Sequence, residues 1–106
     1  MKINVTTISS QRYLDDDTVD AKSVALDYTV TVSPSFGIDG KIFRAIINGH
    51  HSYAAAIAAG VDPVFSIATA QQDDRILLID TNIDDFLASS YVDSDWYDVF
   101  TGKSIF

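Results

Sequence analysis

Hydrophobic and polar residues alternate most clearly over residues 24–32, VALDYTVTV. Valine, leucine and tyrosine occupy every second position, and polar residues fill most of the positions between them. A period of two residues predicts a strand with one buried face. The preceding residues 9–23 are polar and acidic, so we expect a loop there with at most one helical turn.

Residues 41–48, KIFRAIIN, are apolar on both faces of an extended chain. Such a strand usually lies inside a sheet, because both of its faces are covered. A proline and two glycines in residues 33–40 predict a turn before it. We therefore expect residues 24–48 to form an antiparallel hairpin with a long turn.

Three further short apolar runs, bounded by polar residues, have the pattern of strands. They are residues 1–8, 63–69 and 75–80. The tail, residues 92–106, is expected to form one helical turn around Trp96 and then a short extended end.

Helical segments are predicted at residues 50–59 and 81–91. The first is rich in alanine and is followed by Gly60, a common helix stop. The second has Thr81 or Asn82 as its N-cap and aspartates in its first turn, where negative charge stabilises a helix. Its inward stripe consists of Ile83, Phe86, Leu87 and Ser90.

This order of elements predicts an α+β fold with two helices and a small mixed or antiparallel sheet. With 106 residues, 47% of them hydrophobic, we expect one domain over residues 1–106. The absence of cysteine excludes disulfides, a thiol nucleophile and thiolate metal ligands. No apolar run approaches the ~18 residues of a membrane span, and residues 1–13 lack a secretion signal, so we expect a cytoplasmic protein without membrane contact.

The charge is strongly acidic, with fifteen acidic and seven basic residues and a net charge of −8. All the acids are aspartates. Repulsion from phosphates argues against direct nucleic-acid binding. Two interpretations remain open: the aspartates serve solubility, turns and helix caps, or they form a surface that mimics nucleic acid or meets a basic protein partner.

The strongest candidate site is the junction in INGHHSYAAAIAAG, residues 47–60. Here the chain leaves an interior strand, turns and enters a helix, whose first N–H groups have no internal partner and lie at the positive end of the dipole. Such a start can hold an anion. The expected phosphate or ligand contacts are Asn48, Gly49, His50, His51 and Ser52.

The two histidines are adjacent, and adjacent helical residues do not share a face. One is therefore expected to cap or pack, while the other contacts a ligand; structural roles for both remain an alternative. A metal site is not expected, because two helical ligands to one ion need a spacing of four residues.

The segment GHHSYAAAIAAGVDPV also resembles the central motif of the ParB-like and sulfiredoxin-like superfamily. Positions that fall on the family pattern are Asn48, Gly49, His51, Ala55 and Gly60, and the similarity covers roughly residues 40–67. It implies that superfamily's fold and a nucleotide-phosphate site at the helix start. The family's arginine is replaced by Ser52, and the sulfiredoxin cysteine is absent, so the resemblance implies a binding domain without catalytic residues.

A second candidate surface lies in the tail. Asp93, Asp95 and Asp98 flank Trp96 and Tyr97, and aromatics among acids are typical of protein-binding surfaces. The alternative is that Trp96 fills the edge of the core.

Two functions fit these observations. The first is a non-catalytic binding protein with a phosphate or nucleotide site after Gly49; no cofactor is identified. The second is a phage or mobile-element anti-defence inhibitor, which acts by protein contact through an acidic surface. Aspartates gathered on one face away from the histidines would favour the second.

Overall fold

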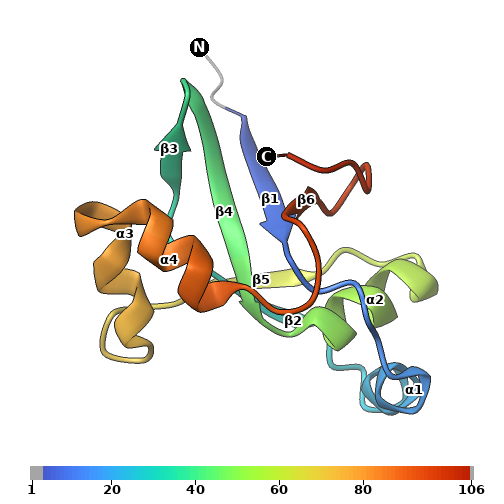
Figure 1. Cartoon of the computed structure of the whole chain (residues 1–106). Coiled ribbons are helices and arrows are strands. Elements are labelled where there is room, and N and C mark those ends of the chain that lie inside the picture. Colours follow the sequence, from blue (N-terminus) through green and yellow to red (C-terminus); the bar gives the residue numbers. More distant parts are fainter. Residues whose placement is uncertain (1–3, 106) are drawn as a thin grey trace.

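The computed structural model describes residues 4–105 and consists of a mixed β-sheet with helices on both faces (Figure 1). The strand order is β5-β2-β4-β1-β6, and β3 also pairs with β4. The strands are β1 (Val5–Ser9), β2 (Thr29–Val32), β3 (Phe36–Ile38), β4 (Lys41–Asn48), β5 (Val64–Ile67) and β6 (Tyr97–Asp98). The prediction of a small α+β fold is confirmed. The first three residues of the predicted first strand lie outside the described part of the chain.

Four α-helices and one 3-10 helix surround the sheet in this part of the chain. The helices are α1 (Asp16–Val24), α2 (His50–Ala59), α3 (Leu78–Thr81) and α4 (Ile83–Ser90), with the 3-10 helix η1 (Asp74–Leu77) before α3. Both predicted helices are confirmed as α2 and α4, but the expected total of two is wrong: α1 occupies much of the segment predicted as a loop, and α3 lies in a segment predicted as a strand. Within residues 4–105, no helix combines the length and apolar character required to cross a bilayer.

Strand β4 is the centre of the sheet, as its apolar pattern predicts. It runs parallel to β1 and antiparallel to β2 and β3. Its side chains alternate between two cores. Phe43 and Ala45 pack with α4 and the η1–α3 segment on one face, while Ile46 packs with Tyr53 of α2 on the other. Both faces of β4 are therefore covered.

The predicted strand at residues 24–32 is wrong in its first half. Only Thr29–Val32 are extended, and the preceding residues end α1 and turn. Asp15 starts α1 by accepting a hydrogen bond from the Asp17 N–H at 3.0 Å, and Leu26 adopts a positive φ of 54°. Leu26 is 73% exposed, so the alternation around it does not mark a buried face.

The predicted long turn at residues 33–40 contains strand β3. Strands β3 and β4 are joined by Asp39 and Gly40, with φ values of 52° and 77°. Two positive φ values define the tight hairpin turn that Asp-Gly favours. Strand β3 thus interrupts the connection between β2 and β4. These two strands still pair antiparallel, and β3 forms its own tight hairpin with β4.

The predicted strand at residues 75–80 is also wrong, because this segment forms η1 and part of α3. The Asp73 carboxylate starts η1 by accepting a hydrogen bond from the Arg75 N–H at 3.0 Å. Ile76, Leu78 and Ile79 then pack on the core that contains Phe86. A short apolar run is compatible with either structure, and here the cap selects the helix.

The corner between β4 and α2 depends on Gly49. This residue has a φ of 94°, and a Cβ atom there would lie 2.7 Å from the Thr29 carbonyl oxygen of β2. Glycine allows both the left-handed conformation and the close approach. Gly60, which ends α2, has a similar φ of 70° but open space around it.

These two glycines form a matched pair for mutation. We expect Gly60→Ala to cost about 1 kcal/mol of unfolding free energy, because only the left-handed strain is added. Gly49→Ala should cost about 3 kcal/mol or more, because the new methyl group also collides with the β2 backbone. Urea unfolding of both variants measures the difference. Equal losses would show that the contact with Thr29 does not constrain the corner.

Candidate functional site

The start of α2 borders a polar hollow of about 350 Å³. Its lining residues are Gln11, Lys22, Ile47, Asn48, Gly49, His50 and His51. The structure therefore brings together four of the five residues predicted from the sequence. It adds Lys22 from α1 and Gln11 from the segment after β1. Neither had a sequence signal, because both are distant from the motif along the chain.

The backbone at this corner has donors directed out of the helix. The Gly49 N–H donates to the Asn48 side-chain oxygen at 2.8 Å, and the Tyr53 N–H makes the first intrahelical bond, to the Gly49 carbonyl, also at 2.8 Å. The N–H groups between them precede that bond and have no carbonyl partner within α2. They lie at the positive end of the α2 dipole.

Lys22 adds a positive charge beside this helix start. Its Nζ lies 3.0 Å from an Asp27 carboxylate oxygen, and both side chains are partly exposed. This hydrogen bond is the main reason that the pKa of Asp27 is lowered. An anion in the hollow would therefore share Lys22 with Asp27, so electrostatic binding there is weak.

Ser52 is a correction to the predicted ligand contacts. It is 1% exposed and does not line the hollow. Its hydroxyl is directed to the Asp27 side chain and helps to lower the pKa of that carboxyl. Ser52 therefore anchors α2 to the loop before β2.

His51 has a structural partner. Its Nε2 accepts a hydrogen bond from the Asp15 backbone N–H at 3.1 Å, at the start of α1. An accepting Nε2 places the proton of the neutral ring on Nδ1. One of the two histidines thus ties α1 to α2, as the adjacency of the pair predicts.

His50 lies on the other side of α2 from the His51 contact, against β1. Its Nε2 is 2.7 Å from the Ser9 hydroxyl oxygen, and that oxygen also accepts the Gln11 N–H at 3.0 Å. The Ser9 hydroxyl can satisfy both contacts by accepting from Gln11 and donating to Nε2 of His50. In that arrangement the neutral ring carries its proton on Nδ1, which is then a donor. Burial, followed by the nearby His51, lowers the pKa of His50 to about 4, although Asp93 opposes the shift. The ring is therefore neutral near pH 7.

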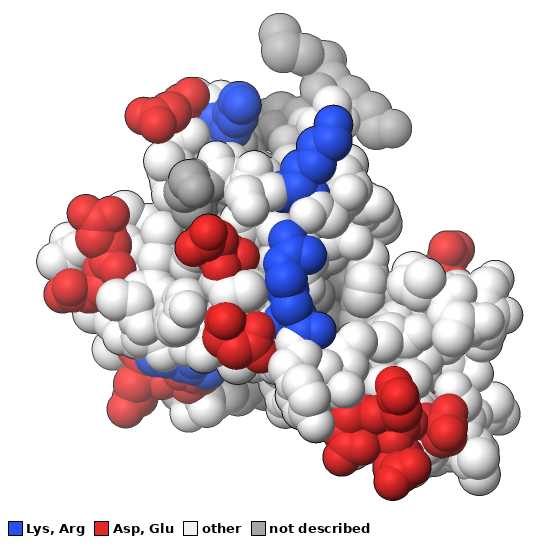
Figure 2. Space-filling view, turned by 45° about the vertical axis from the view of Figure 1, so that its right-hand side comes forward, with Lys and Arg blue, Asp and Glu red and all other residues white. Residues whose placement is uncertain are grey.

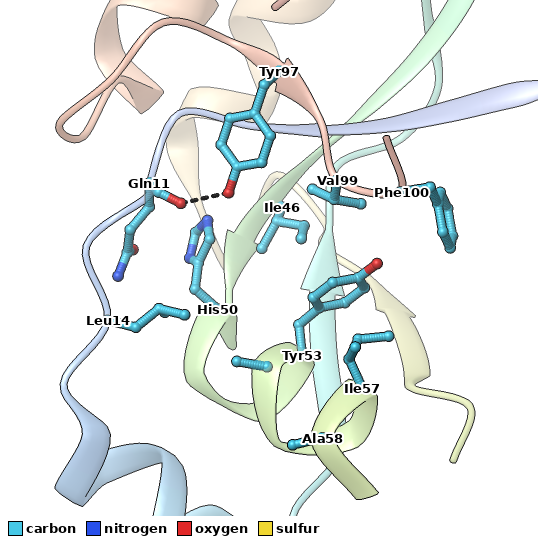
Figure 3. A pocket seen from close by; sticks show the side chains of 11 residues that line it. Gln11, Leu14, Ile46, His50, Tyr53, Ile57, Ala58, Tyr97, Val99 and Phe100 are labelled. Atoms are coloured by element: carbon cyan, nitrogen blue, oxygen red, sulfur yellow. Dashed lines mark hydrogen bonds between the residues drawn. The ribbon is translucent and has the colours of Figure 1, made fainter. Parts of the chain in front are cut away.

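A mostly apolar cavity of about 430 Å³ adjoins this hollow and shares His50 and Gln11 with it. Figure 3 shows the rings of His50, Tyr53 and Tyr97 around the cavity, with Ile46 at its floor. Its other lining residues are Leu14, Ala54, Ile57, Ala58, Val99 and Phe100. The volume lies in the range of sites for small organic ligands.

Polar atoms are few in this cavity. The Tyr97 hydroxyl is occupied, because it donates to the Gln11 carbonyl at 2.6 Å (Figure 3). Within the described chain, the Tyr53 hydroxyl, the Gln11 side-chain oxygen and the Nδ1 of His50 make no hydrogen bond. Burial, more than the nearby Asp98, raises the pKa of Tyr53, so its hydroxyl is a neutral donor. These groups can orient a ring within apolar walls.

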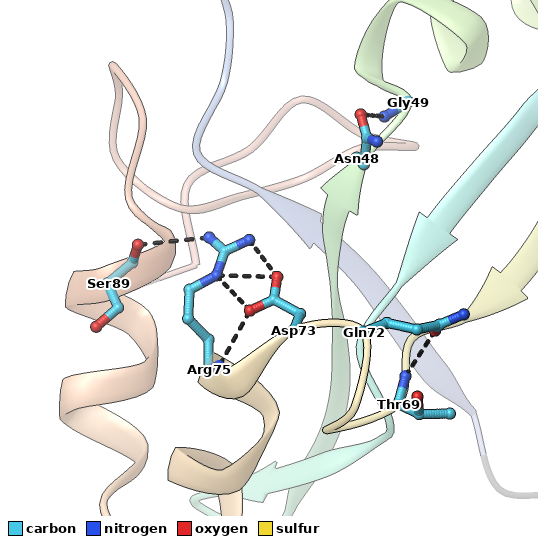
Figure 4. A network of polar contacts seen from close by, with 7 residues as sticks. All are labelled: Asn48, Gly49, Thr69, Gln72, Asp73, Arg75 and Ser89. Atoms are coloured by element: carbon cyan, nitrogen blue, oxygen red, sulfur yellow. Dashed lines mark hydrogen bonds and ion pairs between the residues drawn. The ribbon is translucent and has the colours of Figure 1, made fainter.

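Asn48 also borders a third hollow, of about 380 Å³, which is polar. There, Arg75 forms a two-pronged pair with Asp73, with the shortest contact at 2.6 Å, and reaches the Ser89 carbonyl at 3.4 Å (Figure 4). The pKa of Asp73 is lowered mainly by this hydrogen bonding. The guanidinium is used to fix η1 against α4, which leaves it little capacity for a ligand.

Trp96 and Tyr97 of the tail pack into the fold and do not form an exposed aromatic patch. Trp96 is only 8% exposed and belongs to the core, which confirms the alternative that it fills the edge of the core, whereas the predicted helical turn around it is wrong. Asp93 accepts hydrogen bonds from the Arg12 and Tyr13 N–H groups at 2.8 and 3.3 Å.

Two more residues of the predicted partner surface, Tyr97 and Asp98, form β6 against β1. Asp98 also accepts the Phe100 N–H at 2.8 Å. Of the five residues predicted for a partner surface, only Asp95 is exposed with a carboxylate that makes no hydrogen bond or ion pair in the described structure; its carbonyl accepts the Ser94 hydroxyl at 3.2 Å.

The acidic side chains occur in several separate groups (Figure 2). The largest group in this view covers α1, where Asp15, Asp16, Asp17 and Asp20 are exposed, and basic side chains lie among the other groups. The α1 group is adjacent to His51 rather than remote from it. On this face the distribution gives the mimicry alternative no specific support.

Comparisons with family models, with curated proteins and with solved structures found no match to this chain. Within residues 4–105, no group of three histidine or aspartate side chains is arranged to hold a metal ion. The site is therefore interpreted from its own geometry.

The lowered pKa of His50 predicts a pH dependence of stability. The unfolded chain takes up this proton near pH 6.5 and the folded chain near pH 4, so the unfolding free energy should fall as the pH drops through that interval. The loss is at most about 1.4 kcal/mol for each pH unit between the two pKa values. Urea unfolding between these pH values should show a flatter profile for His50→Gln than for the unmodified protein.

His51→Gln is the matched control, because it leaves the burial of His50 in place and should retain the loss. Aspartates with lowered pKa values, such as Asp27 and Asp73, lose stability mainly below pH 5, so they add to the loss only at the acid end of this interval, in both variants alike. An imidazole NMR titration midpoint near 6.5 for His50 in the folded protein would contradict the assignment.

Proposed function

We propose that this protein is a non-catalytic binding protein for a nucleotide, with the phosphate at the start of α2 and the base in the adjoining apolar cavity. The observation that carries the proposal is that the two spaces lie side by side, because His50 and Gln11 line both of them. One polar hollow beside one ring-lined cavity matches a ligand with an anionic end and a planar end. The resemblance of residues 40–67 to the ParB-like and sulfiredoxin-like superfamily agrees with this ligand class.

The base would supply most of the binding free energy. Tyr53 and the neutral His50 offer ring faces on which a base can stack, at about 1–3 kcal/mol per base. The free polar atoms of Tyr53, Gln11 and His50 can pair with its edge. The phosphate end contributes less, because Lys22 already pairs with Asp27.

The described residues that line these two spaces include no serine or threonine. Ser9 contacts His50, but it is 0% exposed and cannot reach a ligand. The unprotonated His50 is a weak base with a pKa of about 4, below the range that suits general base catalysis near pH 7. Binding without turnover is therefore the function that we propose.

The two halves of the site can be tested separately by calorimetry with a nucleoside monophosphate, the matching nucleoside and inorganic phosphate. Ala54→Leu places a larger side chain into the cavity, and we expect it to weaken the nucleotide and the nucleoside at least tenfold while phosphate binding is unchanged. Lys22→Gln should weaken the nucleotide about fivefold, the equivalent of about 1 kcal/mol, and should leave the nucleoside unaffected.

Each variant has a control in the same chain. Ala59→Leu lies on the same helix and is exposed outside the cavity, so it should bind as the unmodified protein does. Lys41→Gln removes the same charge from the far end of β4. Absence of nucleotide binding would refute the proposal, and equal effects of Ala54→Leu and Ala59→Leu would place the base elsewhere.

A further inference from the structure

Strand β5 forms one edge of the sheet and pairs only with β2 in the described structure. The Val64 and Ala68 N–H groups donate to the Tyr28 and Val32 carbonyls at 2.9 and 2.8 Å. Successive residues of a strand direct their backbone N–H and C=O groups alternately toward one neighbouring strand and the other. The N–H and C=O groups of Phe65 and Ile67 therefore point away from the sheet. They form an open template for another strand.

Strand β5 itself offers no charge against pairing, and the Arg44 guanidinium of β4 lies over the Phe65 ring, 4.2 Å from its centroid. The sequence of β5 is VFSI, without a charged residue in a chain whose net charge is −8. Val64 and Ile67 are each 62% exposed. Pro63 before the strand and the four-residue length of β5 limit pairing, but neither covers the outward groups of Phe65 and Ile67.

We propose that two copies of this chain pair through antiparallel β5 strands about a two-fold axis at Ser66. In this register, Phe65 of one copy lies opposite Ile67 of the other, and the outward N–H and C=O groups of all four residues are satisfied. Two apolar cross-strand pairs form on one face, and such pairs are stabilising. No charged residue of β5 meets another, because the strand has none.

The neighbouring registers are less favourable for reasons within the sequence. A two-fold axis at Phe65 places Pro63 opposite Ile67, and proline has no N–H to donate. An axis at Ile67 requires Thr69, whose N–H already donates to the Gln72 side chain at 3.0 Å and whose carbonyl accepts the Gln72 and Asp73 N–H groups. Ser66 is therefore the centre that leaves the fewest groups without partners.

The dimer should be weak. A stable interface buries about 1,600 Å², more than two four-residue strands provide. Two chains of charge −8 also repel each other at low ionic strength, so added salt should strengthen the dimer. Association that rises with both protein concentration and salt is the expected behaviour.

Sedimentation analysis over micromolar to millimolar protein tests the register through the residue on the axis. In a non-hydrogen-bonded antiparallel pair the two Cα atoms are about 4.5 Å apart, so like charges at this position repel strongly. Ser66→Asp and Ser66→Lys should each be monomeric, and an equimolar mixture of the two should dimerise. The Ser66 side chain is exposed, so the folded monomer should tolerate both changes, as circular dichroism can verify.

Ser35→Asp and Ser35→Lys are the controls, since Ser35 is exposed outside β5 and both variants should dimerise as the unmodified protein does. A monomeric unmodified protein at every concentration and salt would overturn the proposal. Dimerisation of either Ser66 variant alone, or failure of the mixture to dimerise, would overturn the register.

Discussion

The contact between Gly49 and the Thr29 carbonyl is the constraint on which the arrangement of this molecule depends. It sets the position at which the chain leaves β4, and hence the direction of α2 across the β2 side of the sheet. A direct contact between two backbones leaves no side chain that can adapt. The positions of His50, His51 and Tyr53 follow from it, because all three lie on the first turn and a half of α2.

The adjacent histidines show how one helical turn can serve two neighbours. They diverge by about 100° around α2, so one reaches the buried hydroxyl of Ser9 and the other reaches the start of α1. Each imidazole is held through Nε2, and the buried His50 is neutral near pH 7. The pair therefore joins three segments before any ligand is considered, and its contribution to the site is position and hydrogen bonding rather than charge.

The sequence predicted those elements whose local signals agree with their packing. Strand β4 is apolar on both faces, helix α2 is rich in alanine and stops at a glycine, and helix α4 has an Asn82 cap and an apolar stripe; all three form as expected. The segments around Leu26 and Ile76 differ from the prediction because helices α1 and η1, each started by an aspartate cap, extend into them. Short apolar patterns do not reveal such caps, since strand and helix fit them equally well.

The candidate site was predictable only in part, for a topological reason. The residues from Asn48 to His51 form one continuous motif, whereas Lys22, Gln11 and Tyr97 come from segments up to 49 positions away along the chain. Nothing in their local sequence distinguishes them. Ser52 lies in the motif but faces inward, since a helix of 3.6 residues per turn cannot direct three consecutive side chains to one side.

Helix α1 has no buried residue in its nine positions, and its first turn is attached to α2 through the ring of His51. A segment with so little apolar contact opens at low free-energy cost while the sheet stays intact. Its amide protons should consequently exchange with solvent well before those of α2, whose inner face contains the buried Ala55 and Ala56. The wall of the site that carries Lys22 is thus expected to open before the sheet does.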